Sequence, residues 1–228
     1  MTHPSCTLIT GAADGIGWAT AQALAAAGHA VVLLDVRAEP AQARASSLGP
    51  LHLGLGCDVT DAASVQAALA VVLQRFERIE GLVNNAGVGD QTGATIDQSV
   101  DAFERVLSVH LRGCFLMSQA VGRQMLAQAR LGPAGRGAIV NLGSIASLTG
   151  LPMRNAYSAA KAGVLGMTRA MASEWALTVS SALRRRARAI GLVGGVFLVL
   201  LGLLQVLGWW PTVIHWVQDL LPTTSLPL

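Results

Sequence analysis

The one tyrosine and the one lysine of this 228-residue chain lie four positions apart, as Tyr157 and Lys161. On a helix, this spacing places both side chains on one face. An ammonium group close to a phenol favours the ionised phenolate. A tyrosine in that setting can donate and accept a proton near neutral pH. The pair therefore predicts an acid–base site, although a chance pair on a surface helix would have the same spacing.

A glycine-rich turn near the N-terminus suggests a second kind of chemistry. Residues 5–10 predict a short buried strand, residues 11–17 form the turn, and Trp18 to Ala27 predict an alanine-rich helix. Glycines let the backbone approach a pyrophosphate closely, and a helix N-terminus offers it free N–H groups. We therefore expect this region to bind a dinucleotide through Thr10, Gly11, Asp14, Gly15, Ile16 and Gly17.

The next predicted strand ends in an acidic residue. Asp35 follows the apolar run 30–34 and lies 18 positions after Gly17. At about this separation an acidic side chain accepts hydrogen bonds from the adenosine ribose hydroxyls. Asp35 and Asp14 would repel the 2′-phosphate of NADP, so the sequence predicts NAD, and Arg37 is the one nearby group that could soften this preference. A strand-end turn residue is the alternative role for Asp35.

Together these motifs resemble those of the short-chain dehydrogenase/reductase family. The resemblance runs from about Thr7 to about Trp175. The family's motifs recur in order at Thr10-Gly11 with Gly15 and Gly17, at Asp58-Val59, at Asn84-Asn85-Ala86-Gly87, at Ser144, and at Tyr157 with Lys161.

The resemblance implies two sets of functional residues. The catalytic set would be Ser144, Tyr157, Lys161 and His110. The cofactor set would extend beyond the turn to Asp35, Asp58, Val59, Asn85, Ala86, Gly87, Tyr157 and Lys161. The implied reaction transfers a hydride between a nicotinamide cofactor and a small secondary alcohol or ketone. Ser144 would hold the substrate oxygen while Tyr157 exchanges its proton.

His110 marks a departure from the family pattern. Relatives carry an asparagine there, in a Val-Asn-Leu-x-Gly context, which orders a water next to the lysine. This chain has Val-His-Leu-Arg-Gly at residues 109–113. A histidine ring nitrogen can also hold a water. Two interpretations stay open, a histidine that replaces the asparagine and a satisfied helix histidine with no catalytic part.

Alternating apolar runs and helix-length stretches predict an α/β fold with a doubly wound parallel sheet of the Rossmann type over residues 1–178. Strands are expected at Cys6–Ile9, Val31–Leu34, Leu51–Gly56, Gly81–Val83 and Ala138–Leu142, and helical periodicity extends over Ala102–Arg130. Such a sheet binds its cofactor at the carboxyl ends of the strands. By resemblance, the long helix and the tyrosine helix form the contact of a possible homodimer.

The sequence changes character after the tyrosine helix. The strand and Pro-Gly loop that follow in the family do not appear, so we expect a fold truncated after that helix. Residues 179–188 form a basic linker, and Ala189–Trp210 follows without a charged residue. At about 1.5 Å per residue this run spans about 33 Å, enough for a bilayer. We therefore predict a single transmembrane helix.

The flanks of this run predict its orientation. Its preceding arginines place the N-terminal domain in the cytoplasm, anchored to the cell membrane, with residues 211–228 as an interfacial or disordered tail. The part after residue 180 carries four arginines and one aspartate, and thus the whole net charge of +3. The domain itself therefore lacks the basic footprint of a nucleic-acid-binding protein. A frameshift or gene fusion is the other explanation of this tail.

Two functions compete. The first is an active NAD(P)-dependent oxidoreductase acting on a secondary alcohol or ketone, with Leu148, Leu151 and Met153 as an apolar substrate wall. The alternative is a truncated or fused dinucleotide-binding module with little or no catalytic activity.

The scattered residues Cys6, Cys57 and Cys114 predict reduced, buried thiols. The isolated histidines suggest no metal site, and the N-terminus suggests no signal peptide.

Overall fold

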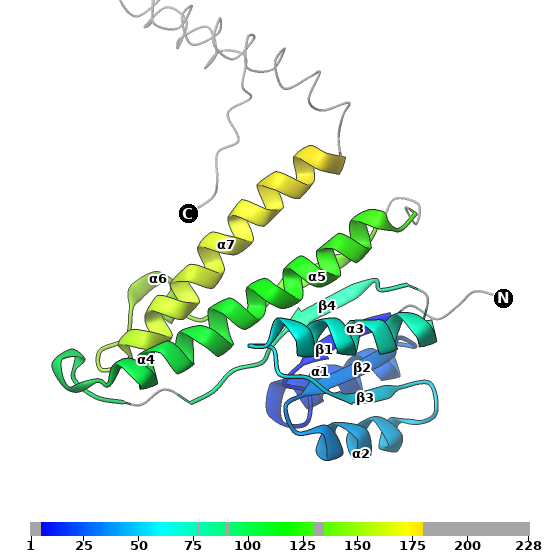
Figure 1. Ribbon diagram of the computed structural model, residues 1–228, viewed down its shortest axis with the longest axis horizontal. Coiled ribbons are helices and arrows are strands. Elements are labelled where there is room, and N and C mark those ends of the chain that lie inside the picture. The colour runs from blue at the N-terminus through cyan, green and yellow to red at the C-terminus, as the bar shows by residue number, and fades with distance from the viewer. Residues whose placement is uncertain (1–5, 77, 90–91, 130–134, 180–228) are drawn as a thin grey trace, which may run out of the picture. The chain divides into compact units, whose positions relative to one another are not determined.

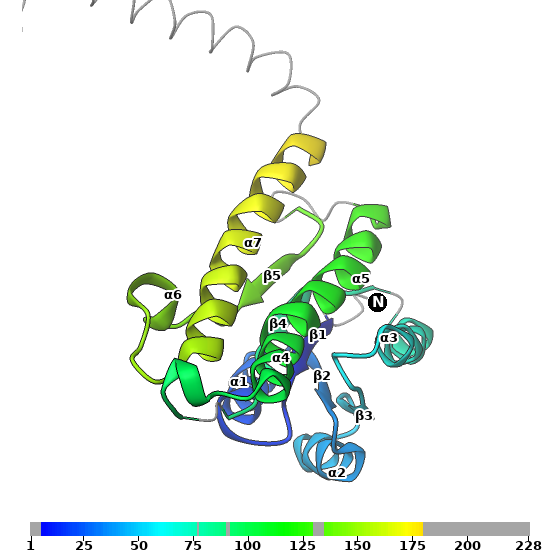
Figure 2. The same cartoon turned by 60° about the vertical axis from the view of Figure 1, so that its left-hand side comes forward.

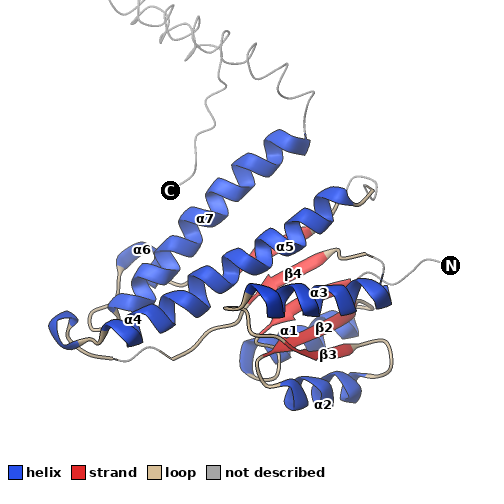
Figure 3. Ribbon diagram, viewed as in Figure 1, coloured by secondary structure: helices blue, strands red, loops and turns tan. Residues whose placement is uncertain are grey.

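A single parallel sheet organises the part of the chain that the structure describes. The computed structural model describes residues 6–76, 78–89, 92–129 and 135–179. The strands are β1 (Cys6–Thr10), β2 (Ala30–Asp35), β3 (Leu53–Gly56), β4 (Gly81–Asn84) and β5 (Ala138–Asn141). They pair in parallel in the order β3-β2-β1-β4-β5, as a doubly wound fold requires. Figure 2 labels all five strands, and Figure 3 colours the strands red. The predicted Rossmann-type architecture is confirmed.

Helices cover both faces of this sheet (Figures 1 and 2). They are α1 (Gly15–Ala26), α2 (Ala38–Leu48), α3 (Ala62–Phe76), α4 (Val100–Leu107), α5 (Cys114–Ala127), α6 (Ala146–Thr149) and α7 (Asn155–Val179), with a 3-10 turn η1 (Thr95–Asp97) and a π-helical turn η2 (Ser108–Gly113). The chain divides into two units after Ala170, and of the second unit the structure describes residues 171–179. The functional residues discussed below all lie in the first unit.

The alternation of side chains along the central strands builds two cores. On one face, Leu8, Val32 and Leu34 pack with α3 and α5. On the other face, Ile9, Val31 and Leu33 pack with α1 and α2. Every residue of β1 and β2 is buried, because a parallel sheet covered on both faces leaves neither side to water.

The strand β5 is packed less completely than β2. Among the described residues it pairs only with β4. Val140 in β5 is 52% exposed, whereas every residue of β2 is at most 6% exposed. The sheet is therefore well covered at its centre and open beside β5, within the part of the chain that the structure describes.

The elements differ from the sequence-based expectations mainly at their ends. Strand β3 begins at Leu53 rather than Leu51, and α1 begins at Gly15 rather than Trp18, because the Asp14 side chain caps it. The helical stretch expected at Ala102–Arg130 begins at Val100 and contains η2 in its middle, while Arg130 lies outside the described residues. The π turn brings Gly113 against Val59, where a Cβ would come within 2.7 Å of Val59 Cγ2.

No helix within the described ranges combines the length and the apolar character needed to cross a membrane. The run predicted to span the bilayer, Ala189–Trp210, lies outside those ranges. The same holds for the tail 211–228 and for the basic linker after Val179.

Candidate cofactor and catalytic site

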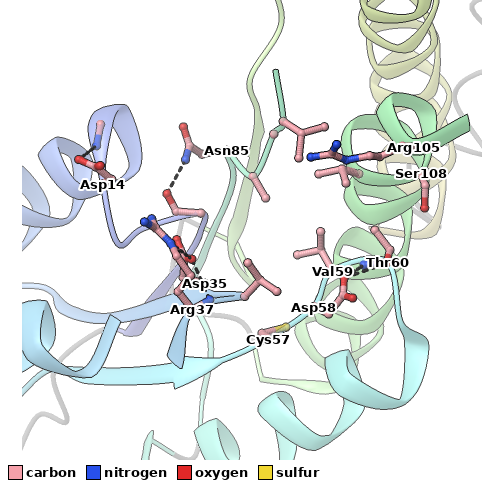
Figure 4. Close-up of a pocket in the computed structure, with 17 residues that line it drawn as sticks. Asp14, Asp35, Arg37, Cys57, Asp58, Val59, Thr60, Asn85, Arg105 and Ser108 are labelled. Carbon is pink, nitrogen blue, oxygen red and sulfur yellow. Dashed lines mark hydrogen bonds and ion pairs between the residues drawn. The ribbon is translucent and has the colours of Figure 1, made fainter. Parts of the chain in front are cut away.

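A cavity of about 750 Å³ lies beyond the carboxyl ends of the central strands (Figure 4). Its walls are the turn after β1, the segments that follow β2, β3 and β4, and the α4–η2 stretch. In an open parallel sheet, this edge is where ligands bind. Of the predicted cofactor residues, the lining includes Gly11, Asp14, Gly15, Asp35, Asp58, Val59, Asn85, Ala86 and Gly87.

The turn after β1 is locked to the segment after β4. The Thr10 hydroxyl oxygen accepts hydrogen bonds from the backbone N–H groups of Asn85 (3.0 Å) and Ala86 (2.9 Å). In return, the Asn85 side-chain amide donates to the carbonyl oxygens of Thr10 (2.9 Å) and Gly11 (3.0 Å). Thr10 is buried and supports the wall from behind, whereas Ile16 is exposed at the start of α1.

Two glycines of this turn are required by space. Gly11 has a φ of +63°, and a Cβ there would lie 2.9 Å from Ala86 Cα. A Cβ on Gly17 would lie 2.3 Å from the carbonyl oxygen of Gly11 and 2.6 Å from the Asn85 amide nitrogen. The turn can therefore pack this closely against Asn85 and Ala86 only because these side chains are missing.

The acidic residues of the cavity have defined partners. Asp35, which is buried, accepts hydrogen bonds from Ala13 N (3.1 Å) and Arg37 N (3.0 Å), and forms an ion pair with the Arg37 guanidinium (3.2 Å). Asp14 accepts from Gly15 N (2.8 Å) and so caps α1. Asp58 accepts from Thr60 N (2.8 Å). Figure 4 shows Asp35 and Arg37 together on the wall formed by the end of β2.

The tyrosine and the lysine lie on one face of α7, as their spacing predicts. Lys161 Nζ is 5.8 Å from the centre of the Tyr157 ring and donates a 2.6 Å hydrogen bond to the carbonyl oxygen of Leu142. Burial lowers the pKa of Lys161, and the nearby Cys114 opposes this shift. The Leu142 contact ties α7 to the segment after β5, which carries Ser144.

Ser144 is held by the start of α6. Its hydroxyl oxygen accepts a 3.1 Å hydrogen bond from Ala146 N, and its own N–H donates to the Ser147 hydroxyl (3.2 Å). A serine hydroxyl has one hydrogen to donate as well as two lone pairs. Since the contact with Ala146 uses a lone pair, the hydroxyl hydrogen stays available for a substrate oxygen.

His110 packs between the cofactor cavity and the tyrosine. Its ring lies edge-on to the Tyr157 ring, with centroids 5.3 Å apart and an interplanar angle of 89°. His110 Nε2 lies 3.2 Å from Val88 N and 3.0 Å from Val88 O. A Cβ on Gly87 would come within 2.5 Å of the ring, so this glycine makes room for the histidine.

A small cavity of about 10 Å³ adjoins these groups, and Lys161, His110, Asn84 and Thr10 contribute to its lining. A space of this size holds at most a single water, and water in a protein interior needs polar partners of this kind. Among the residues that the structure describes, the buried Oδ1 atom of Asn84 has no hydrogen-bond partner, which adds an acceptor to this polar environment.

The comparison with protein families agrees with this geometry. A family model described as short chain dehydrogenase matches residues 5–181. The chain belongs to the short-chain dehydrogenase family. The family resemblance and the Rossmann-type fold predicted from the sequence are thereby confirmed.

Among similar family members, a D-threitol dehydrogenase of Mycolicibacterium smegmatis is 46% identical over 171 residues, which cover 74% of this chain and 63% of the relative. A 2-(R)-hydroxypropyl-CoM dehydrogenase of Xanthobacter autotrophicus is 37% identical over 175 residues, covering 74% of this chain and 68% of the relative. The chain thus spans about two thirds of the length of these relatives.

A solved structure of the family has a similar fold. The structure of 3-ketoacyl-(acyl-carrier-protein) reductase from Brucella melitensis complexed with NADH matches with a TM-score of 0.69 and 29% identity. The match covers 75% of this chain and 70% of that structure.

The present protein also contains a buried network of polar side chains that was not predicted from its sequence. The Asn84 amide donates to the Ser118 hydroxyl (2.9 Å) and to Asn141 Oδ1 (2.8 Å). The Asn141 amide donates to the Thr168 hydroxyl (2.9 Å), and the Cys114 thiol donates to Asn141 Oδ1 (3.2 Å). Burial raises the pKa of Cys114 to about 11, which keeps this thiol protonated. Asparagines at the ends of both β4 and β5 are the sequence signal for this contact.

Arg105 and Ser108 also line the larger cavity without having been singled out from the sequence. Helical spacing could have predicted this position, since Arg105 and Val109 lie four residues apart and hence share a face.

Within the described residues, no group of histidine, cysteine and acidic side chains is arranged to hold a metal ion. All three cysteines are buried and free, as predicted.

Proposed function

We propose that this chain is an NAD-dependent oxidoreductase acting on a small secondary alcohol or ketone. The observation that carries the proposal is the pairing of Tyr157 with the buried Lys161 on α7, next to a cavity of dinucleotide-binding geometry. Membership of the short-chain dehydrogenase family supports the same reaction class. The polyol and hydroxyalkyl names of the relatives favour a small hydroxylated substrate.

The residues present fit a nicotinamide dinucleotide. The missing side chains at Gly11 and Gly17 let the turn pack closely against residues 85–86, and the N-terminus of α1 beside it offers backbone N–H groups to a pyrophosphate. Asp35 would accept from the adenosine ribose, Asp58 and Val59 would border the adenine, and residues 85–87 would line the path towards the nicotinamide. When bound, the nicotinamide supplies the hydride acceptor for an alcohol or the hydride donor for a ketone.

Side chains of the protein bind the substrate oxygen and transfer the proton. The Ser144 hydroxyl hydrogen bonds to the substrate oxygen, and Tyr157 takes the hydroxyl proton of an alcohol or returns one to a ketone. The ammonium of Lys161 lies 5.8 Å from the centre of the Tyr157 ring, close to the group that exchanges the proton. The hydrogen bond from Lys161 to Leu142 O keeps that ammonium beneath the ring.

This function is tested by assaying the detergent-extracted full chain with NAD and a panel of polyols and secondary alcohols. We expect NADH to appear with at least one substrate, and Tyr157→Phe to abolish turnover while NADH binding persists. NADH binding without turnover by the parent chain would instead favour the alternative, a dinucleotide-binding module with little activity. The exposed Val140 and the β5 edge, open among the described residues, favour that alternative.

We propose that NAD is preferred to NADP. Asp35 carries its charge at the ribose position, and the Arg37 guanidinium is engaged in an ion pair with it. A 2′-phosphate would meet this carboxylate and, farther along the turn, Asp14. Fluorescence titration should give tighter binding of NADH than of NADPH, and Asp35→Ala should narrow the gap. Equal affinities in the parent chain would contradict this preference.

We propose that His110 takes the place of the family's asparagine and holds a water beside Lys161. The cavity of about 10 Å³ next to both side chains supports this role. The contact of its Nε2 with Val88 holds the ring in place at the same time.

We propose that residues 1–178 form the catalytic domain and that Ala189–Trp210 anchors it to the membrane, with the domain on the cytoplasmic side. The support is the length of the uncharged run and the arginines of the linker before it. The full chain should then stay with membranes in alkaline carbonate. Its recovery in the soluble fraction without detergent would contradict the anchor.

We propose that the domain forms a homodimer through the α5–α7 side. An apolar groove of about 540 Å³, with Leu107, Leu111, Phe115 and Met167 in its lining, supports this contact. Phe115 is 45% exposed and would be buried there. Sedimentation of the detergent-solubilised chain should give a dimer that Phe115→Glu dissociates, and a monomeric parent chain would refute the contact.

A further inference from the structure

Arg105 stands out among the residues that line the cofactor cavity. It lies on α4, and Figure 4 shows its guanidinium extending from the helix into the cavity, on the side opposite Asp14 and the glycine-rich turn. Phe103, Val106 and Leu107 pack on the core formed with α7. Arg105 is therefore left on the face of α4 that borders the cavity.

The charges around the cavity explain why this guanidinium matters. Three carboxylates, of Asp14, Asp35 and Asp58, line the cavity together with only two cationic side chains. Arg37 is engaged by Asp35. Among the residues that the structure describes, ion pairs join Arg37 to Asp35 and Arg78 to Glu80, and Arg105 takes part in neither. A phosphate that enters this acidic cavity would find one uncommitted guanidinium in its walls.

We propose that Arg105 binds the pyrophosphate of the dinucleotide, as a second anchor across the cavity from the N-terminus of α1. This inference rests on the proposed function, since it assumes that the cavity holds a dinucleotide. A guanidinium presents a planar set of donors that matches two phosphate oxygens at once. The backbone N–H groups of the glycine turn then contact the anion from one side and Arg105 from the other.

The anchor also has a consequence for the catalytic residues. Arg105 and His110 lie on the continuous stretch formed by α4 and η2. His110 in turn packs edge-on against Tyr157. A phosphate held by Arg105 would therefore restrain the same helical stretch that positions the tyrosine ring.

The test compares Arg105→Gln with Arg123→Gln in the full chain. Arg123 is an exposed arginine on α5 that does not line the cavity, so its substitution makes the same chemical change elsewhere. Loss of one charge-assisted phosphate contact should weaken NADH binding about tenfold or more in Arg105→Gln. Arg123→Gln should bind NADH like the parent, and Arg105→Lys should recover part of the affinity.

Competition by adenosine and by ADP locates the contact. Arg105→Gln should lower the affinity for ADP and make that affinity less dependent on salt concentration. The affinity of the variant for adenosine should equal that of the parent chain. Equal loss for adenosine and ADP would show that the guanidinium contacts the adenine, and equal NADH affinity in parent and variant would remove the anchor altogether. Both results overturn the proposal. If the parent chain binds neither NADH nor ADP, the proposed function fails, and this inference fails with it.

Discussion

The turn after β1 and the surroundings of Tyr157 hold their functional groups by different means. At the turn, the side chains of Thr10 and Asn85 form hydrogen bonds with backbone atoms. Gly11 and Gly17 are required there because a side chain at either position would clash with neighbouring atoms. Around Tyr157, side chains from several elements supply the contacts, as His110 and Lys161 do. A steric requirement tolerates almost no added atom, whereas a polar network tolerates substitutions that keep its hydrogen bonds.

The same contrast appears in the sheet below these two regions. The strands under the turn, β1 and β2, are buried along their whole length. The strand that leads to Ser144, β5, is partly exposed, and its last residue is held by the amide of Asn84. The cofactor side therefore relies on apolar packing, while the catalytic side relies on a few buried hydrogen bonds.

The largest expected effect comes from Gly17→Ala. The added Cβ would lie 2.3 Å from the carbonyl oxygen of Gly11, too close for any real contact, so the turn and the Asn85 segment must move apart. We expect loss of measurable NADH binding, checked by fluorescence titration. The matched control is Gly166→Ala on α7, where a Cβ meets no atom within 4 Å. That control should bind NADH normally and gain about 0.5–1 kcal/mol of stability.

Substitutions of His110 test the side-chain network near the tyrosine. His110→Phe keeps an aromatic ring against Tyr157 but removes both ring nitrogens, whereas His110→Asn restores a polar group. If His110 holds a water beside Lys161, turnover falls about tenfold or more in the Phe variant and is largely kept in the Asn variant. The pH profile of kcat should change only in the Phe variant. Equal rates in both variants would leave His110 as packing alone.

A smaller effect is expected from Asn141→Leu. The change removes the acceptor used by the Asn84 amide and the donor received by Thr168, so buried polar groups lose partners. Such a loss costs about 1–3 kcal/mol of unfolding free energy. Thr168→Val is the milder comparison, because Asn141 keeps its contact with Asn84. Denaturant midpoints of the two variants measure the difference, and equal midpoints for both variants and the parent would deny the network a stabilising role.

Several features were predictable from the sequence because they depend on neighbours along the chain. The strand positions follow from short apolar runs, the turn of residues 11–17 from its glycines, and the common face of Tyr157 and Lys161 from helical spacing. Even for these elements, an end differs from the prediction where a side chain forms a capping hydrogen bond. Asp14 began α1 three residues early, because its carboxylate accepts from Gly15 N.

Other features depend on how distant parts of the chain meet. Asn84 and Asn141 are 57 residues apart and become partners only through the parallel register of β4 and β5. The π turn that carries His110 and the position of Arg105 in the lining of the cavity are likewise visible only in the tertiary structure. The sequence by itself determined the local elements and the types of catalytic group, since these follow from spacing. Only the tertiary structure decided which groups share a cavity, because burial and strand register join residues that no local pattern relates.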